Sequence, residues 1–303
     1  MRVMLVLDFD GNLTDVEQEA GPFTTGYLAD LATLLDKPVD AVQSLADQAY
    51  RDIAGDPATH GWRFGGKLMA PATVDPYLRM TAIASQLLGQ TGNFPDGFID
   101  RLGSLLFRHH YRNTKDVLKP STLWMLLEAY RLKMNVWVVT NSGTSAVQGK
   151  IGRALDAGSP EDCPIVNWWT PRVIGDARKF DPSDNPEAGV KWPYKDSYFR
   201  FRGFPRDTVI KRPHYFKVLD SLRHQLGEST HEFLDWAQVM VVGDIFELDL
   251  ALPLWLGCHV GLMVNEHTPP WEVDLLTSNP NGRILRAPEE IPAFYASIGC
   301  RAP

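Results

Sequence analysis

The sequence predicts an α/β fold built on a doubly wound, mostly parallel sheet, and two patterns support this. First, short and nearly uninterrupted apolar runs are typical of strands that are covered on both faces of a sheet, and such runs occupy residues 3–7, 136–139, 239–242 and 259–264. Second, apolar residues at helical spacing separate these runs, at 122–132, 145–155, 214–226 and 247–256. Strands that alternate with helices in this way form parallel sheets. Ligands of such sheets bind at the carboxyl ends of the strands.

The long segment between the first two predicted strands has a different pattern. Its apolar residues recur at helical spacing, in groups at 27–35, 42–49, 80–87 and 98–106. We expect an inserted α-helical domain over residues 15–118 and an α/β core formed by 1–14 and 119–303. Within the core, a proline-rich segment near 156–207 is expected to be irregular. It includes a predicted short strand at 198–202, where apolar and arginine side chains alternate.

Composition excludes several classes of protein. The 303 residues are 44% apolar and 22% charged, which is typical of a globular chain. The net charge of −7 disfavours a general nucleic-acid-coating role. Three widely spaced cysteines, Cys163, Cys258 and Cys300, exclude a disulfide scaffold and a cysteine zinc site, and they suit a reducing compartment. The apolar run at the start is too short for a signal peptide or a membrane helix, so we expect a cytoplasmic protein.

Two aspartates follow the first predicted strand. Asp8 and Asp10 are two residues apart, so in extended backbone their side chains point to the same side. Gly11 then allows a sharp turn. Neighbouring carboxylates repel unless a cation or a shared proton compensates. The motif alone fits equally well a solvated strand end closed by an Asx turn.

Thr140 and Asn141 follow the second predicted strand, directly before a predicted helix. Hydroxyls and free backbone N–H groups at a helix N-terminus can hold an anion. The alternative is a helix cap formed by Ser142 or Thr144.

Acidic residues follow the third predicted strand. Asp244 lies at its carboxyl end and Asp249 in the next predicted helix, and Mg²⁺ prefers carboxylate oxygens of this kind. Asp244 and Glu247 also have the spacing of a capping box, and both roles can hold.

A cation for this site is offered by Lys211, just ahead of Pro213, which is well placed at the first position of a predicted helix. Lys217, one turn into that helix, is the competing candidate.

Together these motifs and their order resemble those of the haloacid dehalogenase-like (HAD) hydrolase superfamily. The matching segments are Asp8-Phe9-Asp10-Gly11, the strand 136–139 with Thr140 after it, and Gly243-Asp244 followed by Asp249. The resemblance covers the predicted core. The helical insert lies where this superfamily carries its C1 cap.

The resemblance implies a role for each matched residue. Asp8 would be the nucleophile that attacks phosphorus, and Asp10 the general acid and base. Thr140 would hold a phosphoryl oxygen, and Lys211 would neutralise the nucleophile and the phosphate. Further phosphate-binding candidates are Gly11, Asn141 and Lys217. The metal ligands would be Asp8, Asp10, Asp244 and Asp249.

Two departures from the superfamily pattern affect this assignment. Asn12 stands where Thr or Val is frequent. Arg212 separates Lys211 from the following proline, whereas the superfamily commonly has lysine directly before proline. The choice between Lys211 and Lys217 therefore stays open, as does the choice between Asp249 and Glu247 as an additional metal ligand.

Two further features lie outside these motifs. Residues 191–212 hold seven Lys and Arg against two Asp, with aromatic residues interleaved. We favour a surface hairpin with its arginines in water over an anion-binding face. His109 and His110 end a predicted helix of the insert, and because the sequence offers no matching third metal ligand, we expect a polar helix end.

We therefore expect a Mg²⁺-dependent phosphatase that acts on a small phosphorylated metabolite through a phosphoaspartyl intermediate. Asp10 favours phosphoryl chemistry because the dehalogenases of the superfamily lack this second aspartate. The alternatives are a phosphotransferase or phosphomutase with the same chemistry, and a non-catalytic phosphate-binding module on the same fold. We expect neither a nucleic-acid partner nor a membrane partner, and the sequence does not indicate an oligomeric state.

Overall fold

The structure, a computed structural model, describes residues 3–90, 94–95, 97–155, 163–230 and 234–299. Two predicted features, Cys300 and residues 156–162 of the irregular segment, lie outside the described residues. The chain divides into two compact units, the first formed by Met1–Thr14 with Leu118–Pro303 and the second by Asp15–Val117.

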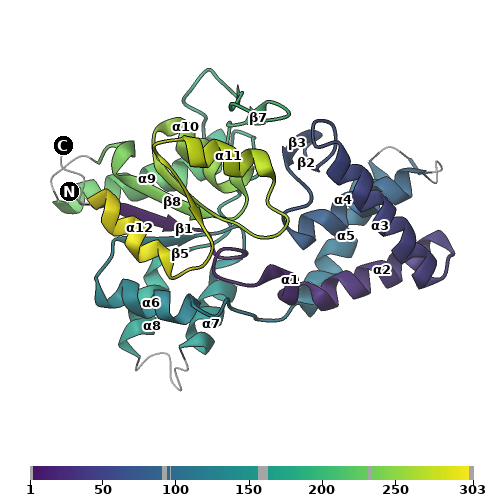
Figure 1. Ribbon diagram of the computed structural model, residues 1–303, viewed down its shortest axis with the longest axis horizontal. Coiled ribbons are helices and arrows are strands. Elements are labelled where there is room, and N and C mark those ends of the chain that lie inside the picture. Colours follow the sequence, from purple (N-terminus) through teal and green to yellow (C-terminus); the bar gives the residue numbers. More distant parts are fainter. Residues whose placement is uncertain (1–2, 91–93, 96, 156–162, 231–233, 300–303) are drawn as a thin grey trace. The chain divides into compact units, whose positions relative to one another are not determined.

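The first unit is built on a parallel sheet of six strands in the order β10-β9-β8-β1-β4-β5 (Figure 1). The strands are β1 Met4–Leu7, β4 Val136–Val139, β5 Val173–Ile174, β8 Val239–Gly243, β9 His259–Met263 and β10 Gly282–Leu285. The predicted α/β class and the four predicted strands are confirmed, each strand to within one residue at either end. The sequence pattern misses β5 and β10, because neither a two-residue strand nor a strand with an exposed arginine contains a long apolar run.

Helices cover both faces of this sheet. They are α6 Thr122–Arg131, α7 Thr144–Ala154, α8 Pro164–Trp169, α9 Pro213–Thr230, α10 Ala251–Leu256, α11 Pro270–Ser278 and α12 Glu290–Gly299. Alternate side chains of β1 serve the two faces, as a buried strand requires. Met4 and Val6 belong to the apolar cluster that includes residues of α9, α10 and α11, whereas Leu5 and Leu7 belong to the cluster with α6, α7 and α12.

The strand order reverses at β1, and this positions the site. β4 pairs with one edge of β1 and β8 with the other, so that Leu7 lies opposite both Val138 and Val242. The carboxyl ends of these three strands therefore meet at one edge of the sheet. Ligands of doubly wound sheets bind at such a reversal.

Two segments of this unit differ from the prediction. The helix predicted over 247–256 begins as a π-helical turn at Phe246–Leu250 and continues as α10. The strand predicted over 198–202 is only two residues long, β6 Tyr198–Phe199, and pairs antiparallel with β7 Thr208–Val209. Phe201 is buried in the core, whereas Tyr198 and Phe199 of β6 are 49% and 41% exposed.

The second unit is mainly helical, with a core of its own. Its elements are α1 Val16–Glu19, α2 Gly21–Leu35, α3 Val39–Gly55, β2 Trp62–Phe64, β3 Lys67–Ala70, α4 Pro76–Gln90 and α5 Phe98–His110. The antiparallel hairpin of β2 and β3 is additional to the predicted helices.

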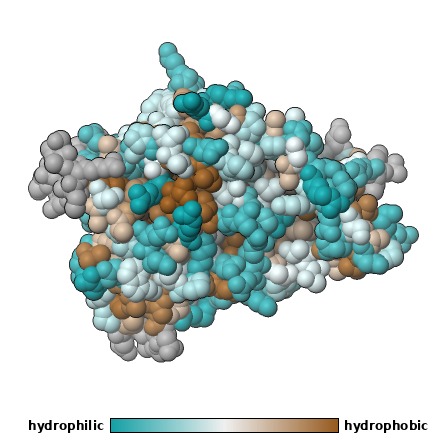
Figure 2. All heavy atoms as spheres, viewed as in Figure 1, coloured by the Kyte–Doolittle hydropathy of each residue, from teal (hydrophilic) through white to brown (hydrophobic). Residues whose placement is uncertain are grey.

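The surface is largely polar in the view of Figure 2, which also shows an apolar area at the lower left, over α6 and α8. On α6 the exposed apolar side chains include Leu123, Trp124 and Leu127. Among the described helices, none combines the length and the apolar character that crossing a membrane requires.

Two neighbouring leucines of α6 provide a matched test of the packing. Leu126 is fully buried under the sheet, whereas Leu127 is 40% exposed. We expect Leu126→Ala to lower the free energy of unfolding by about 2–5 kcal/mol, because it leaves a cavity. Leu127→Ala should change it by about 0.5 kcal/mol or less. Urea unfolding measures both, and equal losses would contradict the packing described.

Candidate functional site

Most of the functional residues predicted from sequence, although not the two lysines, converge at the carboxyl edge of β1, β4 and β8. Asp8, Thr140 and Asp244 each directly follow one of these strands. Each of the three residues is buried, with at most 9% of its surface exposed. Asp10 follows in the turn after β1, and Asp249 belongs to the π-helical turn after β8.

The turn after β1 is held by hydrogen bonds to β8 and within the turn itself. The backbone N–H of Asp8 donates to the carbonyl of Val242 at 2.8 Å, and Asn12 Nδ2 donates back to the carbonyl of Asp8 at 2.9 Å. Gly11 has a φ of +71°, and a Cβ there would lie 1.9 Å from Asp244 Oδ2. Gly11 thus leaves the space that the carboxylate of Asp244 occupies. Asn12, the departure from the superfamily pattern, closes the turn.

Asp10 is held by residues of the neighbouring loop. Ser142 Oγ donates to Asp10 Oδ2 at 2.5 Å, and Thr140 Oγ1 donates to the same oxygen at 3.3 Å. Lys150 Nζ of α7 lies 3.7 Å from Asp10 Oδ1. The residue that caps α7 is Gly143, so the hydroxyl of Ser142 serves the site rather than the helix.

The lysine that contacts Asp8 is Lys179, not Lys211 or Lys217 as predicted. Lys179 is 1% exposed, and its Nζ lies 2.6 Å from Asp8 Oδ1 and 2.8 Å from Asp249 Oδ1. Lys211 Nζ instead donates to Asp184 at 2.6 Å, and Lys217 Nζ to the carbonyl of Ala188 at 2.7 Å. The predicted lysines are therefore bonded to the surface of the irregular segment.

Lys179 reaches the site because its loop is bonded to the loop after β4. The backbone N–H groups of Asp176 and Ala177 donate to the carbonyls of Ser142 and Thr140, each at 3.0 Å. The backbone N–H of Lys179 donates to Asn141 Oδ1 at 2.8 Å. The two backbones also approach closely, because a Cβ on Gly175 would lie 2.2 Å from Thr144 N. Asn141, a predicted phosphate ligand, thus positions the loop that carries the lysine.

The backbone around Lys179 is strained. Asp176 and Arg178 have φ angles of 52° and 46°, a left-handed conformation that costs free energy in residues other than glycine. The sequence signal that could have located Lys179 is the pair Val173–Ile174 followed by Gly175. A lysine a few residues after a sheet strand lies at the same edge as the acids.

The acids fit a divalent cation. Oxygens of Asp8, Asp244 and Asp249 lie within 4.8 Å of one another, and Lys179 is the cation that contacts two of them. If all three carboxylates were ionised, one ammonium would leave a net negative charge in a buried place, so an additional cation would stabilise that state. A donor set of carboxylate oxygens is the one that Mg²⁺ prefers. Glu247 is not part of this cluster.

The pKa values of Asp8 and Lys179 also indicate that the acids favour an additional cation. Burial raises the pKa of Asp8 to about 8, against the opposing charge of Lys179. Burial alone would lower the pKa of Lys179, but the charges of Asp249 and Asp8 outweigh it and hold the pKa above its ordinary value. The lysine is thus charged at neutral pH, and a further positive charge near Asp8 would favour its ionised form.

Glu247 has a different role from the one predicted. It forms no capping box with Asp244; the N–H of Ile245 donates to Asp249 Oδ2 at 3.0 Å instead. Glu247 Oε1 accepts a hydrogen bond from Arg206 Nη2 at 2.5 Å, and the Glu247 carbonyl accepts one from Arg212 Nη2 at 3.3 Å. These bonds fix the turn that carries Asp249.

The arginines of the basic segment 191–212 are thus of two kinds. Arg200 and Arg202 are exposed, as predicted for a surface hairpin. Arg206 and Arg212 are buried, 9% and 1% exposed, which corrects the expectation that the arginines lie in water. Burial lowers the pKa of Arg212 to about 10, with Glu247 and Asp181 opposing the shift.

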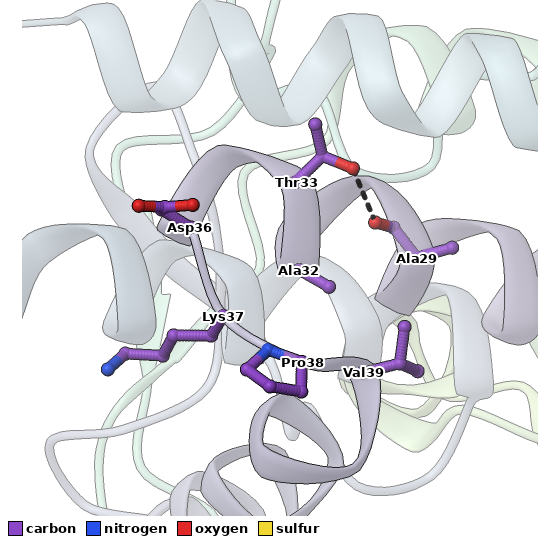
Figure 3. A pocket seen from close by; sticks show the side chains of 7 residues that line it. All are labelled: Ala29, Ala32, Thr33, Asp36, Lys37, Pro38 and Val39. Carbon is purple, nitrogen blue, oxygen red and sulfur yellow. Dashed lines mark hydrogen bonds between the residues drawn. The ribbon is translucent and has the colours of Figure 1, made fainter.

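A surface hollow of about 570 Å³ lies in the second unit, between α2 and α3 (Figure 3). Its lining consists of Ala29, Ala32, Thr33, Asp36, Lys37, Pro38 and Val39. None of these is a residue of the site, so the hollow adds nothing to the chemistry of the acids.

Comparisons with known proteins agree with this fold. No family model matches the sequence, and no curated protein matches it. The HAD hydrolase YfnB of Bacillus subtilis, described as bound to magnesium, has 14% identity and a TM-score of 0.50 over 97% of this chain and 99% of its own. A HAD phosphatase of Thermococcus onnurineus has 12% identity and a TM-score of 0.46 over 97% of both chains. A 2-haloacid dehalogenase of Pseudomonas syringae pv. tomato DC3000 has 14% identity and a TM-score of 0.40 over 98% of this chain and 99% of its own. At 14% identity, the likeness to the YfnB structure shows the fold alone, which is HAD-like.

Glu272 gives this region a pH-dependent stability. It is fully buried, and burial, reinforced by the charge of Glu247, raises its pKa well above the ordinary value. A carboxyl group whose pKa rises on folding stabilises the fold while it is protonated, and that contribution is lost as the pH rises through the raised value. We expect the free energy of unfolding to fall more steeply in the wild type than in Glu272→Gln as the pH rises above the ordinary carboxyl pKa of about 4, by up to about 1 kcal/mol per pH unit.

Urea unfolding at several pH values measures this slope. Glu266→Gln is the matched control, since the Glu266 side chain is 80% exposed, and it should keep the wild-type slope. Identical slopes in the wild type and Glu272→Gln would contradict the assignment.

Proposed function

We propose that this chain, which has the HAD-like fold, is a Mg²⁺-dependent hydrolase that removes phosphate from a small phosphorylated metabolite through a phosphoaspartyl intermediate. The observation that carries the proposal is the pair Asp8 and Asp10. Lys179 contacts Asp8 at 2.6 Å and Ser142 holds Asp10 at 2.5 Å. One acid is thus paired with a cation, and the other is held in place by a hydroxyl.

In the first half-reaction, an oxygen of Asp8 attacks phosphorus. The bond from Asp8 to phosphorus forms as the bond from phosphorus to the leaving oxygen breaks, and Asp10 gives its proton to that oxygen. Covalent catalysis of this kind divides a hydrolysis with a very high uncatalysed barrier into two easier steps.

In the second half-reaction, water attacks the phosphorus of the intermediate. Asp10, now ionised, accepts a proton from the water, and the bond from phosphorus to Asp8 breaks to release phosphate. The same carboxyl group thus serves as acid and then as base, which requires that it stay in one position. The hydroxyl of Ser142 provides that position.

Positive charge makes the attack possible. A carboxylate and a phosphate dianion repel, and Lys179 reduces this repulsion at the attacking oxygen. Thr140 and the N-terminus of α7 face the same edge of the sheet and are suited to hold phosphoryl oxygens. Mg²⁺ held by Asp8, Asp244 and Asp249 would supply further charge neutralisation.

Substitution of the two competing lysines tests which one serves the reaction. We expect Lys179→Met to lower kcat about 10²- to 10³-fold, because it removes charge stabilisation at the nucleophile. Lys211→Met, which removes only the bond to Asp184, should keep kcat within about threefold. Phosphate release from a panel of phosphorylated metabolites measures both, with EDTA as the metal-free control.

Lys179→Met also leaves two buried acids without their ammonium, so circular dichroism must show that it is folded. Lys179→Arg, which keeps the charge, should retain more activity than Lys179→Met. Loss of activity in Lys211→Met comparable to that in Lys179→Met would refute the assignment.

Substitution of the two aspartates tests the covalent intermediate. With p-nitrophenyl phosphate, whose leaving group needs no proton, Asp10→Asn should release a burst of one nitrophenol per protein molecule and then turn over slowly, because water is no longer activated. Asp8→Asn should show neither burst nor turnover. Stopped-flow absorbance and the mass of the quenched protein detect the intermediate, and full activity of Asp8→Asn would exclude the mechanism.

A further inference from the structure

Three metal-ligating side chains meet in the second unit, where α5 packs against α2. His109 and His110 are the last two residues of α5, and Asp30 lies on α2. One ligand atom from each lies within 4.8 Å of the others. Among the described residues, the acids of the candidate site form the other group with this property. The third ligand that the sequence does not reveal is thus Asp30, far from the histidines along the chain.

His110 is fixed in a position that suits a ligand. It is 4% exposed, and its Nε2 lies 2.7 Å from Asp30 Oδ2. Its other nitrogen lies against Gly26, one turn before Asp30, where a Cβ would be 2.4 Å from Nδ1. The ring of Tyr27 packs beside it at 5.9 Å between centroids. Nε2 is therefore the nitrogen that faces Asp30.

The other two side chains keep the site accessible. His109 is exposed, and the side chain of Asp30 is 43% exposed. An ion can enter from solvent, and water can complete its coordination. Zinc sites with three protein ligands and one water have this composition.

The donor set differs from that of the catalytic acids. Two imidazoles and one carboxylate suit zinc, cobalt, nickel or copper, whereas magnesium prefers oxygen ligands alone. We propose that Asp30, His109 and His110 form a binding site for a divalent transition-metal ion of the zinc type. This site is independent of the proposed phosphatase reaction.

A simpler arrangement would be a hydrogen bond between His110 and Asp30 at the end of a helix, where an imidazole is favoured by the helix dipole. That pair needs no contribution from His109. The two interpretations therefore differ in the effect of replacing His109.

Cobalt(II) is the probe, because its visible absorption distinguishes a four-coordinate site with nitrogen ligands from an octahedral oxygen site. The full chain is titrated with Co²⁺ in excess Mg²⁺, which occupies the acidic cluster. We expect one equivalent to give an intense visible band, and ITC to give the same stoichiometry. His109→Ala and Asp30→Asn should each weaken the affinity at least about tenfold, since loss of a ligand costs at least as much as loss of an outer partner.

Two control variants should keep the band. Asp249→Asn alters the acidic cluster, and His60→Ala removes an exposed histidine of the same unit that pairs with Asp56. His110→Ala removes a buried ring and can unfold the unit. The test of the metal site therefore uses His109→Ala and Asp30→Asn. Absence of the band, or equal Co²⁺ affinity in the wild type, His109→Ala and Asp30→Asn, would overturn the proposal.

Discussion

The arrangement of the acids of the candidate site depends on one buried ammonium, that of Lys179. Carboxylates that leave water for a common buried place repel one another strongly. Lys179 contacts Asp8 and Asp249 at once and so offsets part of this repulsion within the chain itself. The two bonds join residues that are 171 and 70 positions apart in sequence. The site therefore forms only when the first strand and the middle and last parts of the core are all in place.

The irregular segment, together with Arg212 directly before α9, supplies positive charge to both sides of the π-helical turn. Lys179 contacts Asp249 in this turn, and Arg206 and Arg212 hold Glu247 two residues earlier. A π-helical turn is uncommon and is often found at functional sites. Here it places two acidic side chains so that each meets a different cation. The buried carboxylates of the turn are thus paired with cations from other parts of the chain. This explains why a segment with little regular structure is needed in the core.

The sequence predicts the parts of this molecule that depend on local patterns. The four apolar strands and the residues directly after them, Asp8, Thr140 and Asp244, follow from strand length and from the rule that ligands bind at carboxyl ends. Lys179 is harder to locate, because its strand of two residues gives only a weak signal and its position also depends on hydrogen bonds to another loop. Lys211, the first candidate from sequence, precedes a helix as expected, but its ammonium is bonded to Asp184 and does not contact Asp8.

Long-range pairing also explains the other differences. The spacing of Asp244 and Glu247 fits a capping box, but Glu247 is bonded to Arg206, 41 positions away, and Asp249 accepts the N–H of Ile245. No local pattern contains the information that an arginine of the basic segment is buried. In the same way, His109 and His110 lack a third ligand along the chain and gain one only when α5 packs against α2.

The loop after β5 has a consequence for how this site can vary between related proteins. The shape of this loop is specified by hydrogen bonds that its backbone N–H groups donate and by one close approach of two backbones. Such bonds do not depend on which side chain the donating residue has. Positions 176 and 178 must tolerate their backbone angles and Ala177 must fit the apolar core, whereas Gly175 and Lys179 are required by space and by charge. Substitutions in this loop can therefore change the sequence around the lysine without moving its ammonium. Such a lysine is identified more readily from the structure than from a sequence alignment.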